Sequence, residues 1–207
     1  MRKSVKEIND IKRHFRSVDP AIYAVMKRME LQTLRMEKRT DKYFLKLCQD
    51  IVAQQLGSKA ADAIVKRFLN MFSGMPTPEK VLKISEEKFR AIGMSYAKAR
   101  YIRNLAESVL KGEVSLKRLP KMEDEEVIAE LTKVKGIGRW TAEMFLIFTL
   151  GHEDVFSFGD LGLRRGLEKL YGKNRVRSQK IAEKITSRWA PYRSYGSLAL
   201  WHVLDNR

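Results

Sequence analysis

The 207-residue chain contains a single cysteine, Cys48, and only three histidines, which lie far apart in the sequence. One cysteine excludes an internal disulfide, a cysteine-rich zinc site and a four-cysteine iron–sulfur cluster. The histidines form no HExxH pair, which argues against a catalytic zinc ion. We therefore expect an intracellular protein that binds no metal through its side chains and requires no cofactor.

Long apolar segments are also missing from the sequence. No uninterrupted apolar run reaches the roughly 18 residues that a membrane-spanning helix needs. The charged start, MRKSVKEIND, is not followed by the apolar core of a signal peptide. We expect no membrane association, and a location in the cytoplasm or nucleoid, or in the nucleus if the source is a eukaryote.

Acidic residues are scarce relative to basic ones. The sequence has 41 Lys and Arg against 25 Asp and Glu, a formal net charge of +16 and a pI near 10.0. Such an excess favours a polyanionic partner, because each phosphate that a protein neutralises releases a condensed counterion. With no membrane anchor present, nucleic acid is the favoured partner.

The apolar residues recur at helical spacing along nearly the whole chain, and alternating strand patterns are absent. We expect an all-α protein of about ten helices. Local signals predict several helix ends: Ser58 as an N-cap, Thr77 before Pro78, Ser85 as an N-cap, Gly93 as a stop, and a helix from about Tyr96 to Leu110. A further stripe comprises Phe44, Leu45, Cys48, Ile51, Val52 and Leu56.

The stretch VKGIGRWTAE joins two of these expected helices through a turn with glycines at 136 and 138. Glycines allow a backbone to approach a ligand closely, and the start of the next helix offers N–H groups that have no partner within that helix. Such a hairpin can bind a DNA phosphate without reading sequence. An ordinary tight connection between two helices explains the same spacing equally well.

Four separated segments resemble the helix-hairpin-helix (HhH-GPD) DNA glycosylase superfamily, in its 3-methyladenine DNA glycosylase II (AlkA-like) branch. VKGIGRWTAEMF resembles the hairpin, and DVFSFGDLGLRRGL resembles the family's aspartate segment, with Asp160 placed 22 residues after Gly138. IVAQQLGSKAADAI resembles the helix-turn-helix that faces the DNA minor groove, and RWAPYRSYGSLALW resembles the closing helix of the branch.

The resemblance implies a two-lobed fold with a DNA cleft between the lobes. Residues 1–40 and 152–207 are expected to form one helical lobe. Residues 41–151 are expected to form the other, a six-helix lobe that contains the hairpin. The DNA-binding hairpin residues implied by the resemblance are Lys135, Gly136, Ile137, Gly138, Arg139 and Thr141.

The resemblance also implies the reacting groups. Asp160 is the expected catalytic residue, because a carboxylate beside the deoxyribose stabilises the positive charge that develops as the glycosidic bond breaks. Capping of the helix that follows is the plainer role for this aspartate, and one residue can do both. Family members with lyase activity carry a lysine two residues after the second hairpin glycine; this chain has Trp140 there, so no Schiff base and no lyase activity are expected.

The base pocket implied by the resemblance contains Trp140, Tyr192 and Met144. An aromatic face can stack on a base made cationic by alkylation, although core packing is the commoner role of a tryptophan. Met144 stands where a relative has tyrosine, which leaves the substrate range open. Base flipping requires a side chain that fills the gap in the duplex, and the candidates are Gln55, Leu56, Gly57 and Ser58. Gln54 is interpreted as a structural amide between helices.

These features predict a monofunctional glycosylase that excises alkylated purines of the 3-methyladenine type from double-stranded DNA. Excision would proceed by base flipping and Asp-assisted hydrolysis, leaving an abasic site. Two alternatives stay open: an oxidised-base or mismatch glycosylase, and a non-catalytic protein that binds damaged DNA. The resemblance permits a monovalent cation, Na⁺ or K⁺, on backbone carbonyls of the hairpin. We expect a monomer.

Overall fold

The computed structural model describes residues 5–205, and within that range the chain is helical, with twelve α-helices and no β-strand. The all-α expectation is confirmed, and the described residues form twelve α-helices where about ten were expected. The backbone contacts divide the chain into two compact units. Unit 1 comprises residues 1–35 and 151–207, and unit 2 comprises residues 36–150.

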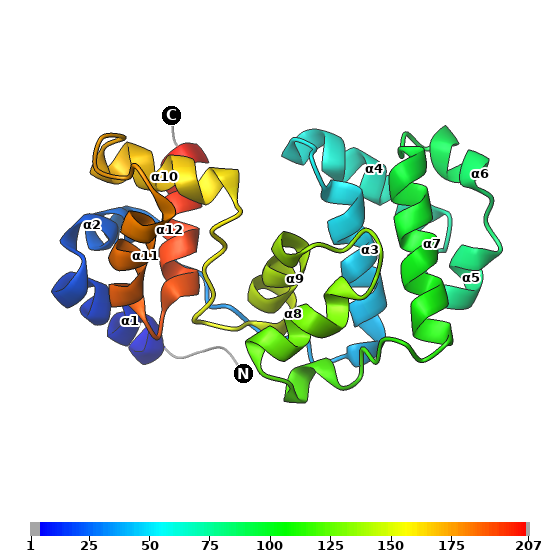
Figure 1. Cartoon of the computed structure of the whole chain (residues 1–207), viewed down its shortest axis with the longest axis horizontal. Helices are drawn as coiled ribbons and strands as arrows, with labels where there is room; N and C mark the ends of the chain where they lie inside the picture. Colours follow the sequence, from blue (N-terminus) through cyan, green and yellow to red (C-terminus); the bar gives the residue numbers. More distant parts are fainter. Residues whose placement is uncertain (1–4, 206–207) are drawn as a thin grey trace. The chain divides into compact units, whose positions relative to one another are not determined.

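Unit 1 is built from the two ends of the chain, drawn in blue and in yellow to red in Figure 1. Its elements are α1 (Val5–Val18), α2 (Pro20–Arg28), α10 (Leu161–Tyr171), α11 (Gln179–Thr186), the 3-10 turn η4 (Ser187–Trp189) and α12 (Arg193–Asp205). Helices α10 and α12 pack closely because Gly166 has no side chain. A Cβ on this residue would lie 2.9 Å from the Cβ and the carbonyl oxygen of Leu200.

The core of unit 1 encloses the carboxylate of Asp19, the N-cap of α2, which is 3% exposed. Asp19 Oδ2 accepts hydrogen bonds from Trp189 Nε1 at 2.8 Å and from Tyr171 Oη at 2.7 Å, and Oδ1 accepts one from the Ile22 amide. Burial without such partners would be unfavourable for a charged group. Asp19 therefore links three helical segments of the unit.

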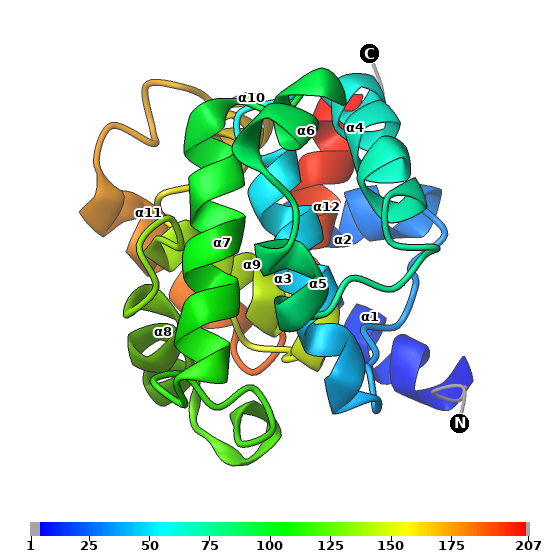
Figure 2. The same cartoon turned by 90° about the vertical axis from the view of Figure 1, so that its right-hand side faces the viewer.

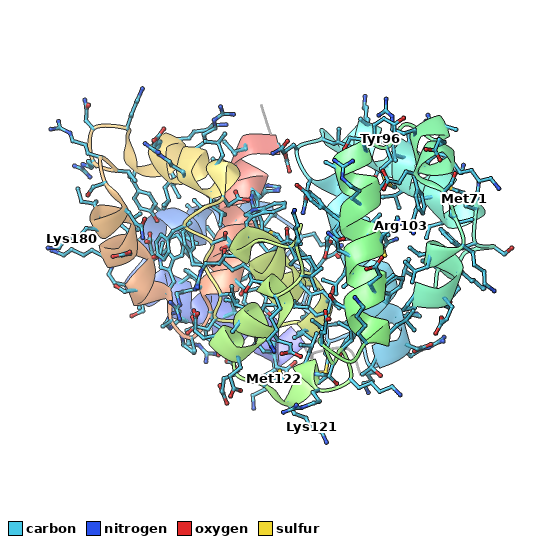
Figure 3. The ribbon with its side chains drawn as sticks, turned by 45° about the vertical axis from the view of Figure 1, so that its right-hand side comes forward. Met71, Tyr96, Arg103, Lys121, Met122 and Lys180 are labelled. Carbon is cyan, nitrogen blue, oxygen red and sulfur yellow. The ribbon has the colours of Figure 1, made fainter. Side chains whose placement is uncertain are left out.

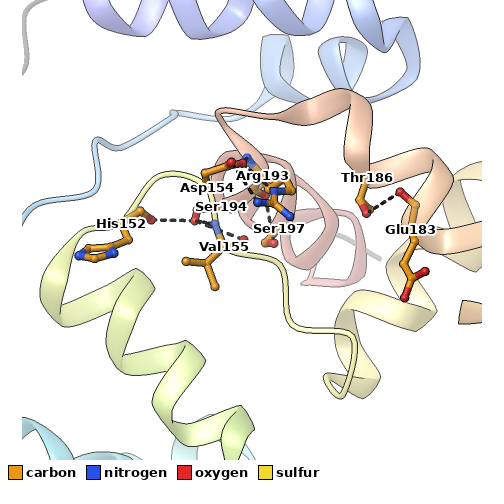
Figure 4. A network of polar contacts seen from close by, with 8 residues as sticks. All are labelled: His152, Asp154, Val155, Glu183, Thr186, Arg193, Ser194 and Ser197. Atoms are coloured by element: carbon orange, nitrogen blue, oxygen red, sulfur yellow. Dashed lines mark hydrogen bonds and ion pairs between the residues drawn. The ribbon is translucent and has the colours of Figure 1, made fainter. Parts of the chain in front are cut away.

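The loop that follows unit 2 in the chain is fastened to the start of α12 (Figure 4). Ser194 Oγ accepts a hydrogen bond from the Val155 amide at 2.9 Å and donates one to the His152 carbonyl at 2.7 Å. Arg193 forms a two-pronged ion pair with Asp154, at 2.7 and 3.0 Å. These contacts fix the segment that leads to Asp160 within the unit.

Unit 2 is continuous in the chain, and Figure 2 views its long central helix, α7 (Tyr96–Leu110), from the side. Its other elements are η1 (Thr40–Lys42), α3 (Tyr43–Ala53), α4 (Ser58–Asn70), α5 (Pro78–Leu82), α6 (Glu86–Ala91), η2 (Leu119–Lys121), α8 (Asp124–Thr132), α9 (Arg139–Phe145) and the π-helical turn η3 (Leu146–Leu150).

Side chains of α7 bind the ends of neighbouring helices. Arg103, labelled in Figure 3, donates to the carbonyl of Leu82, the last residue of α5, and to that of Ile84 just beyond it. Lys98 donates to the carbonyls of Val52 and Gln54 at 2.8 and 2.6 Å, which holds the end of α3. These cations complement helix carbonyls that have no partner within their own helix.

Two expectations about the segment around Ser58 are wrong. Gly57, not Ser58, is the N-cap of α4, and Ser58 is its first residue. Helix α3 ends at Ala53, so Leu56 lies in the following turn with 37% of its surface exposed and does not continue the apolar stripe. The side chain of Ser58 lies outside what the structure describes.

Between residues 5 and 205, no helix combines the length and the apolar character that crossing a membrane requires.

Candidate nucleic-acid interface and active-site residues

The turn between α8 and α9 has two glycines with different surroundings. Gly136 has a φ of +110°, and a Cβ placed there would lie 2.1 Å from Cγ of Tyr101 on α7. Gly138 has an ordinary φ of −93°, and a Cβ there would meet no atom within 4 Å. Gly136 is therefore required by the fold of unit 2, whereas the space beside Gly138 is open.

Two amide side chains hold this hairpin from neighbouring helices. Gln54 Nε2 donates to the Gly136 carbonyl at 3.0 Å and to Thr141 Oγ1 at 3.1 Å. Asn104 Nδ2 donates to the Lys135 carbonyl at 3.1 Å. The prediction that Gln54 is a structural amide is confirmed. The side chain of Thr141 consequently faces the interior of unit 2, where only 2% of the residue is exposed.

The amides at the start of α9 are the hairpin's candidate phosphate donors. The first hydrogen bond of α9 runs from the Ala142 amide to the Gly138 carbonyl. The amides of the residues before Ala142 come too early in the helix to bond to a carbonyl one turn back within it. The Ile137 amide is not among these donors, because it bonds to the Val134 carbonyl at 3.0 Å. Ile137 itself is buried.

Arg139 is engaged by two carboxylates. Its Nε donates to Glu143 at 2.9 Å, and its terminal nitrogens form a two-pronged contact with Glu125. The hydrogen bond from Arg139 lowers the pKa of Glu125 below its ordinary value. In this arrangement the guanidinium charge is compensated, so Lys135, which is exposed, is the better-placed hairpin cation for a phosphate.

The two predicted pocket residues of unit 2 lie one helical turn apart on α9. Trp140 is 36% exposed, unlike the fully buried Trp189 of the unit 1 core, and Met144 is 7% exposed. Phe148, one turn further on in η3, is also exposed. Met144 is buried, so the two exposed rings, Trp140 and Phe148, are the candidate surface for stacking on a base.

The turn between α3 and α4 presents the predicted wedge residues. Gln55 adopts the left-handed conformation, with a φ of +56°, and is exposed, as are Leu56 and Gly57. Gln54 anchors the turn to the hairpin on one side. A fixed turn with projecting side chains is compatible with insertion into a duplex, and Gln55 and Leu56 are equally accessible for that role.

Asp160 is the N-cap of α10 in unit 1, and 9% of the residue is exposed. Its Oδ1 accepts hydrogen bonds from the Leu163 amide at 2.7 Å and from Trp201 Nε1 at 3.2 Å. The carboxylate is thus held in one orientation by α10 and α12. Trp201 was not singled out from the sequence, since its contact with Asp160 spans 41 residues.

Tyr192 precedes α12 in unit 1 and is half-buried. Its ring makes an edge contact with His14 of α1 at 5.3 Å between centroids and another with Tyr195 at 6.2 Å. The ring is therefore packed against the unit 1 core along part of its surface while the remainder is accessible.

A cavity of about 240 Å³ lies within unit 1, beside the loop that precedes Asp160. It is lined by Phe156, Phe158, Arg164, Val176, Arg177 and Gln179, with others, and neither Asp160 nor Tyr192 borders it. This cavity is accordingly not the predicted base pocket.

One ionisable residue with unusual surroundings was missed by the sequence analysis. Asp50 lies on α3, and its Oδ2 is buried without any hydrogen-bond partner, although the residue as a whole retains some accessible surface. Burial raises the pKa of this carboxyl from 3.8 to about 7, against the opposing charge of Lys46. No local sequence signal marks this environment, because it arises from packing around α3.

The raised pKa of Asp50 makes the stability of unit 2 depend on pH. The folded state favours the protonated carboxyl, because its pKa there is higher than in the unfolded chain. The stability that depends on this protonated group is therefore fully present below about pH 4 and is lost as the pH rises through about 7. As the pH rises from 4 to 8, the wild type should lose stability that Asp50→Asn, which cannot ionise, keeps. We expect the unfolding free energy of the variant to rise by about 1–3 kcal/mol relative to that of the wild type over this range, a value reduced to allow for the part of the residue that solvent reaches.

Urea unfolding at a series of pH values measures this gain. Asp62→Asn is the matched control, since Asp62 is exposed on α4 and undergoes the same chemical change. An equal pH dependence in both variants would contradict the assignment of a raised pKa to Asp50.

The sequence profile of the HhH-GPD superfamily, described as base excision DNA repair proteins, matches residues 48–191. The matched region covers well over half of the chain and includes the hairpin and Asp160. The chain therefore belongs to the HhH-GPD superfamily, as the resemblance of its four segments indicated.

Two relatives from yeasts carry the name DNA-3-methyladenine glycosylase. The chain is 36% identical over 169 residues to DNA-3-methyladenine glycosylase 1 of Schizosaccharomyces pombe, covering 80% of this chain and 73% of that protein. It is 29% identical to the DNA-3-methyladenine glycosylase of Saccharomyces cerevisiae, covering 92% and 77%.

Solved structures give the same result for the fold. The S. pombe 3-methyladenine DNA glycosylase Mag1, in complex with abasic DNA, matches with a TM-score of 0.83 and 31% identity, over 93% of this chain and 95% of that one. A DNA-3-methyladenine glycosidase from Bacillus halodurans matches with a TM-score of 0.72 and 36% identity, over 91% and 87%. The expected helix-hairpin-helix glycosylase fold is confirmed.

Proposed function

We propose that this chain is a monofunctional DNA glycosylase that excises alkylated purines of the 3-methyladenine type from double-stranded DNA and leaves an abasic site. The observation that carries the proposal is the 36% identity, over 80% of the chain, to a DNA-3-methyladenine glycosylase. The named activity of that relative requires a group that stabilises the sugar cation and a surface that accepts the base.

Asp160 is the proposed catalytic residue. As the glycosidic bond breaks, positive charge develops on the deoxyribose, and a carboxylate fixed beside it stabilises that charge without having to reorient. The two hydrogen bonds to Oδ1 supply the fixed orientation. The same carboxylate activates the water molecule that adds to the sugar, so the product is an abasic site and a free base.

Trp140 supports the monofunctional assignment. Lyase members of the family use a lysine amine at this position to attack the sugar, and an indole cannot form a Schiff base. In our proposal Trp140, with Tyr192 and Met144, contacts the extruded base. Stacking on a cationic purine contributes about 1–2 kcal/mol where the ring is desolvated. Alkylated purines leave readily, so modest stabilisation is sufficient.

The remaining predicted residues are proposed to bind the duplex. Lys135, the glycine backbone at 136 and 138, and the first amides of α9 would hold a phosphate, while Gln55 or Leu56 would fill the gap left by the flipped base. The net charge of +16 supplies nonspecific affinity that falls steeply with salt. We propose that the protein acts as a monomer.

A monovalent cation on hairpin carbonyls is part of the same proposal. The carbonyls of Val134, Lys135 and Gly136 each accept a hydrogen bond, and each retains a second lone pair for a cation. Affinity for abasic DNA should then be higher in potassium or sodium chloride than in choline chloride of equal ionic strength. Equal affinity in the three salts would remove the cation from the proposal.

Base release from methylated DNA tests the function. DNA treated with dimethyl sulfate is incubated with the protein, and the released bases are separated by chromatography. We expect free 3-methyladenine in a time-dependent yield. Binding to the DNA with no base released would instead identify a non-catalytic damage-binding protein.

A further inference from the structure

The cavity of about 240 Å³ in unit 1 has an apolar interior. Phe156 forms part of its wall, and the ring is held by two neighbours, Phe158 at 4.8 Å and Trp189 of the core at 5.9 Å between centroids. Val176 and Ala182, which are buried, also line the cavity. Because these side chains belong to the core of unit 1, the interior is a preformed surface for a planar apolar group.

Two arginines border the same cavity from the solvent side. Arg164 of α10 and Arg177, in the loop between α10 and α11 (Figure 1), both line it and are both exposed. Arg164 shares its charge with Glu168, at 3.2 Å. Arg177 pairs with no carboxylate among residues 5–205, so its guanidinium is available to an anion.

Two uncharged polar side chains follow Arg177 in the lining. Ser178 is the N-cap of α11, but its side chain makes no capping hydrogen bond, so the hydroxyl is available. Gln179 Nε2 donates to Glu183 at 2.8 Å, which leaves Oε1 as an acceptor at the cavity. A ligand in the cavity would therefore meet an apolar wall, a hydroxyl, an amide oxygen and a guanidinium.

The volume and the chemistry of the lining together fit one nucleotide. At about 240 Å³ the cavity is smaller than the roughly 300–1,000 Å³ pockets that enclose drug-sized ligands, so it suits a single planar ring system. Nucleobases stack on aromatic side chains, and a guanidinium binds phosphate oxygens through paired N–H donors. The acceptor Oε1 of Gln179 favours a base with an exocyclic amino group, such as adenine.

We propose that this cavity is a second nucleotide site, which holds the base of one unpaired nucleotide against Phe156 and its phosphate on Arg177. The site is separate from the proposed catalytic residues, since neither Asp160 nor Tyr192 borders the cavity and Trp140 belongs to unit 2. A free nucleotide and an unpaired nucleotide within a DNA strand present the same chemistry to it. The inference goes beyond the proposed glycosylase function and does not depend on it.

Titration of the ¹⁵N-labelled protein with 2′-deoxyadenosine 5′-monophosphate (dAMP), followed through amide shifts in NMR spectra, locates the binding. We expect saturable shifts at residues 176–179, while the hairpin amides at 136–141 stay in place. Inorganic phosphate and deoxyadenosine each present half of the ligand. Each should bind at least about 10-fold more weakly than dAMP, because a charge-assisted hydrogen bond or a stacked ring is lost.

Arg177→Ala should weaken dAMP binding at least about 10-fold through loss of the charged donor. Arg175→Ala is the matched control, because Arg175 is exposed in the same loop but does not line the cavity. Ala182→Met adds bulk to the wall without changing charge and should also weaken binding. The thermal midpoint reports whether Ala182→Met is folded, and the exposed Arg177 gives a test that does not depend on it.

A single strand of eight deoxyadenylates distinguishes the two sources of the nucleotide. Shifts at 176–179 with both the strand and dAMP, each weakened in Arg177→Ala, would assign the site to unpaired DNA, and shifts with dAMP alone would assign it to free nucleotides. Three results would overturn the proposal: no dAMP shift at 176–179, phosphate that binds as tightly as dAMP, or equal losses in Arg175→Ala and Arg177→Ala. Each would leave the proposed function intact, since base release from methylated DNA is measured separately.

Discussion

Asp160→Asn is expected to lower the single-turnover rate of alkylpurine excision by at least about 100-fold while affinity for abasic DNA changes little. Removing one preorganised charge from a transition state typically costs about 10²–10³-fold in rate. Asparagine is the informative substitution, because its side-chain oxygen can still accept the hydrogen bonds from Leu163 and Trp201. The N-cap of α10 is thereby preserved, since Asn and Asp cap helices equally well.

The rate is measured as abasic sites formed on a duplex with a single 7-methylguanine, and the affinity by fluorescence anisotropy on an abasic duplex. Asp62→Asn controls for the loss of one negative charge. An Asp160→Asn protein that excises at close to the wild-type rate would limit Asp160 to helix capping.

Gly136→Ala and Gly138→Ala should separate the folding role of the hairpin from its binding role. At Gly136, alanine would have to adopt a φ of +110° and place its Cβ 2.1 Å from the Tyr101 ring. Steric overlap and backbone strain each cost roughly 1–3 kcal/mol, so we expect this variant to lose at least about 2 kcal/mol of unfolding free energy.

At Gly138, the backbone is extended and the space beside it is open, so alanine should leave the thermal midpoint within about 2 °C of the wild type. If a DNA backbone approaches this position, the added methyl group weakens affinity, and we expect a loss of about 10-fold on abasic duplex. Unchanged affinity in folded Gly138→Ala would mean that DNA does not approach the hairpin at this glycine.

Much of the local structure could be predicted from the sequence, because its causes lie within a few residues. Helix α7 spans Tyr96–Leu110 as expected, with Ser95 as its N-cap. Thr77 caps α5 through a bond to the Lys80 amide, followed by Pro78 as the first helical residue. The end of α3 was less predictable, since the apolar spacing continues through Leu56 while Gln55 turns the backbone into the left-handed region.

The contacts that shape the candidate site could not be predicted, because they join distant segments. Gly136 is required by Tyr101, which lies 35 positions earlier, and Arg139 is compensated by Glu125 across the hairpin. The hydrogen bond from Trp201 to Asp160 and the burial of Asp50 are likewise products of helix packing. Residue types and spacing indicated which positions matter, and the packing determines what each side chain can do.

The Asp160 segment illustrates how one residue serves two purposes. As an N-cap, Asp160 accepts a hydrogen bond from the Leu163 amide, and this bond fixes the orientation of its carboxylate. A catalytic carboxylate needs the same fixed orientation. Sequence alone treats capping and catalysis as competing explanations. The hydrogen bonds in unit 1 make them compatible, since both use the same side-chain position.

The central claim is hydrolytic release of an alkylated purine without attack by an enzyme amine. It is tested most directly by incubating the protein with an end-labelled duplex that carries one 7-methylguanine and dividing the product among three treatments: none, alkali and borohydride. We predict strand cleavage only after alkali, and no protein–DNA adduct after borohydride. A strand nicked without alkali, together with a borohydride-trapped adduct, would contradict the account.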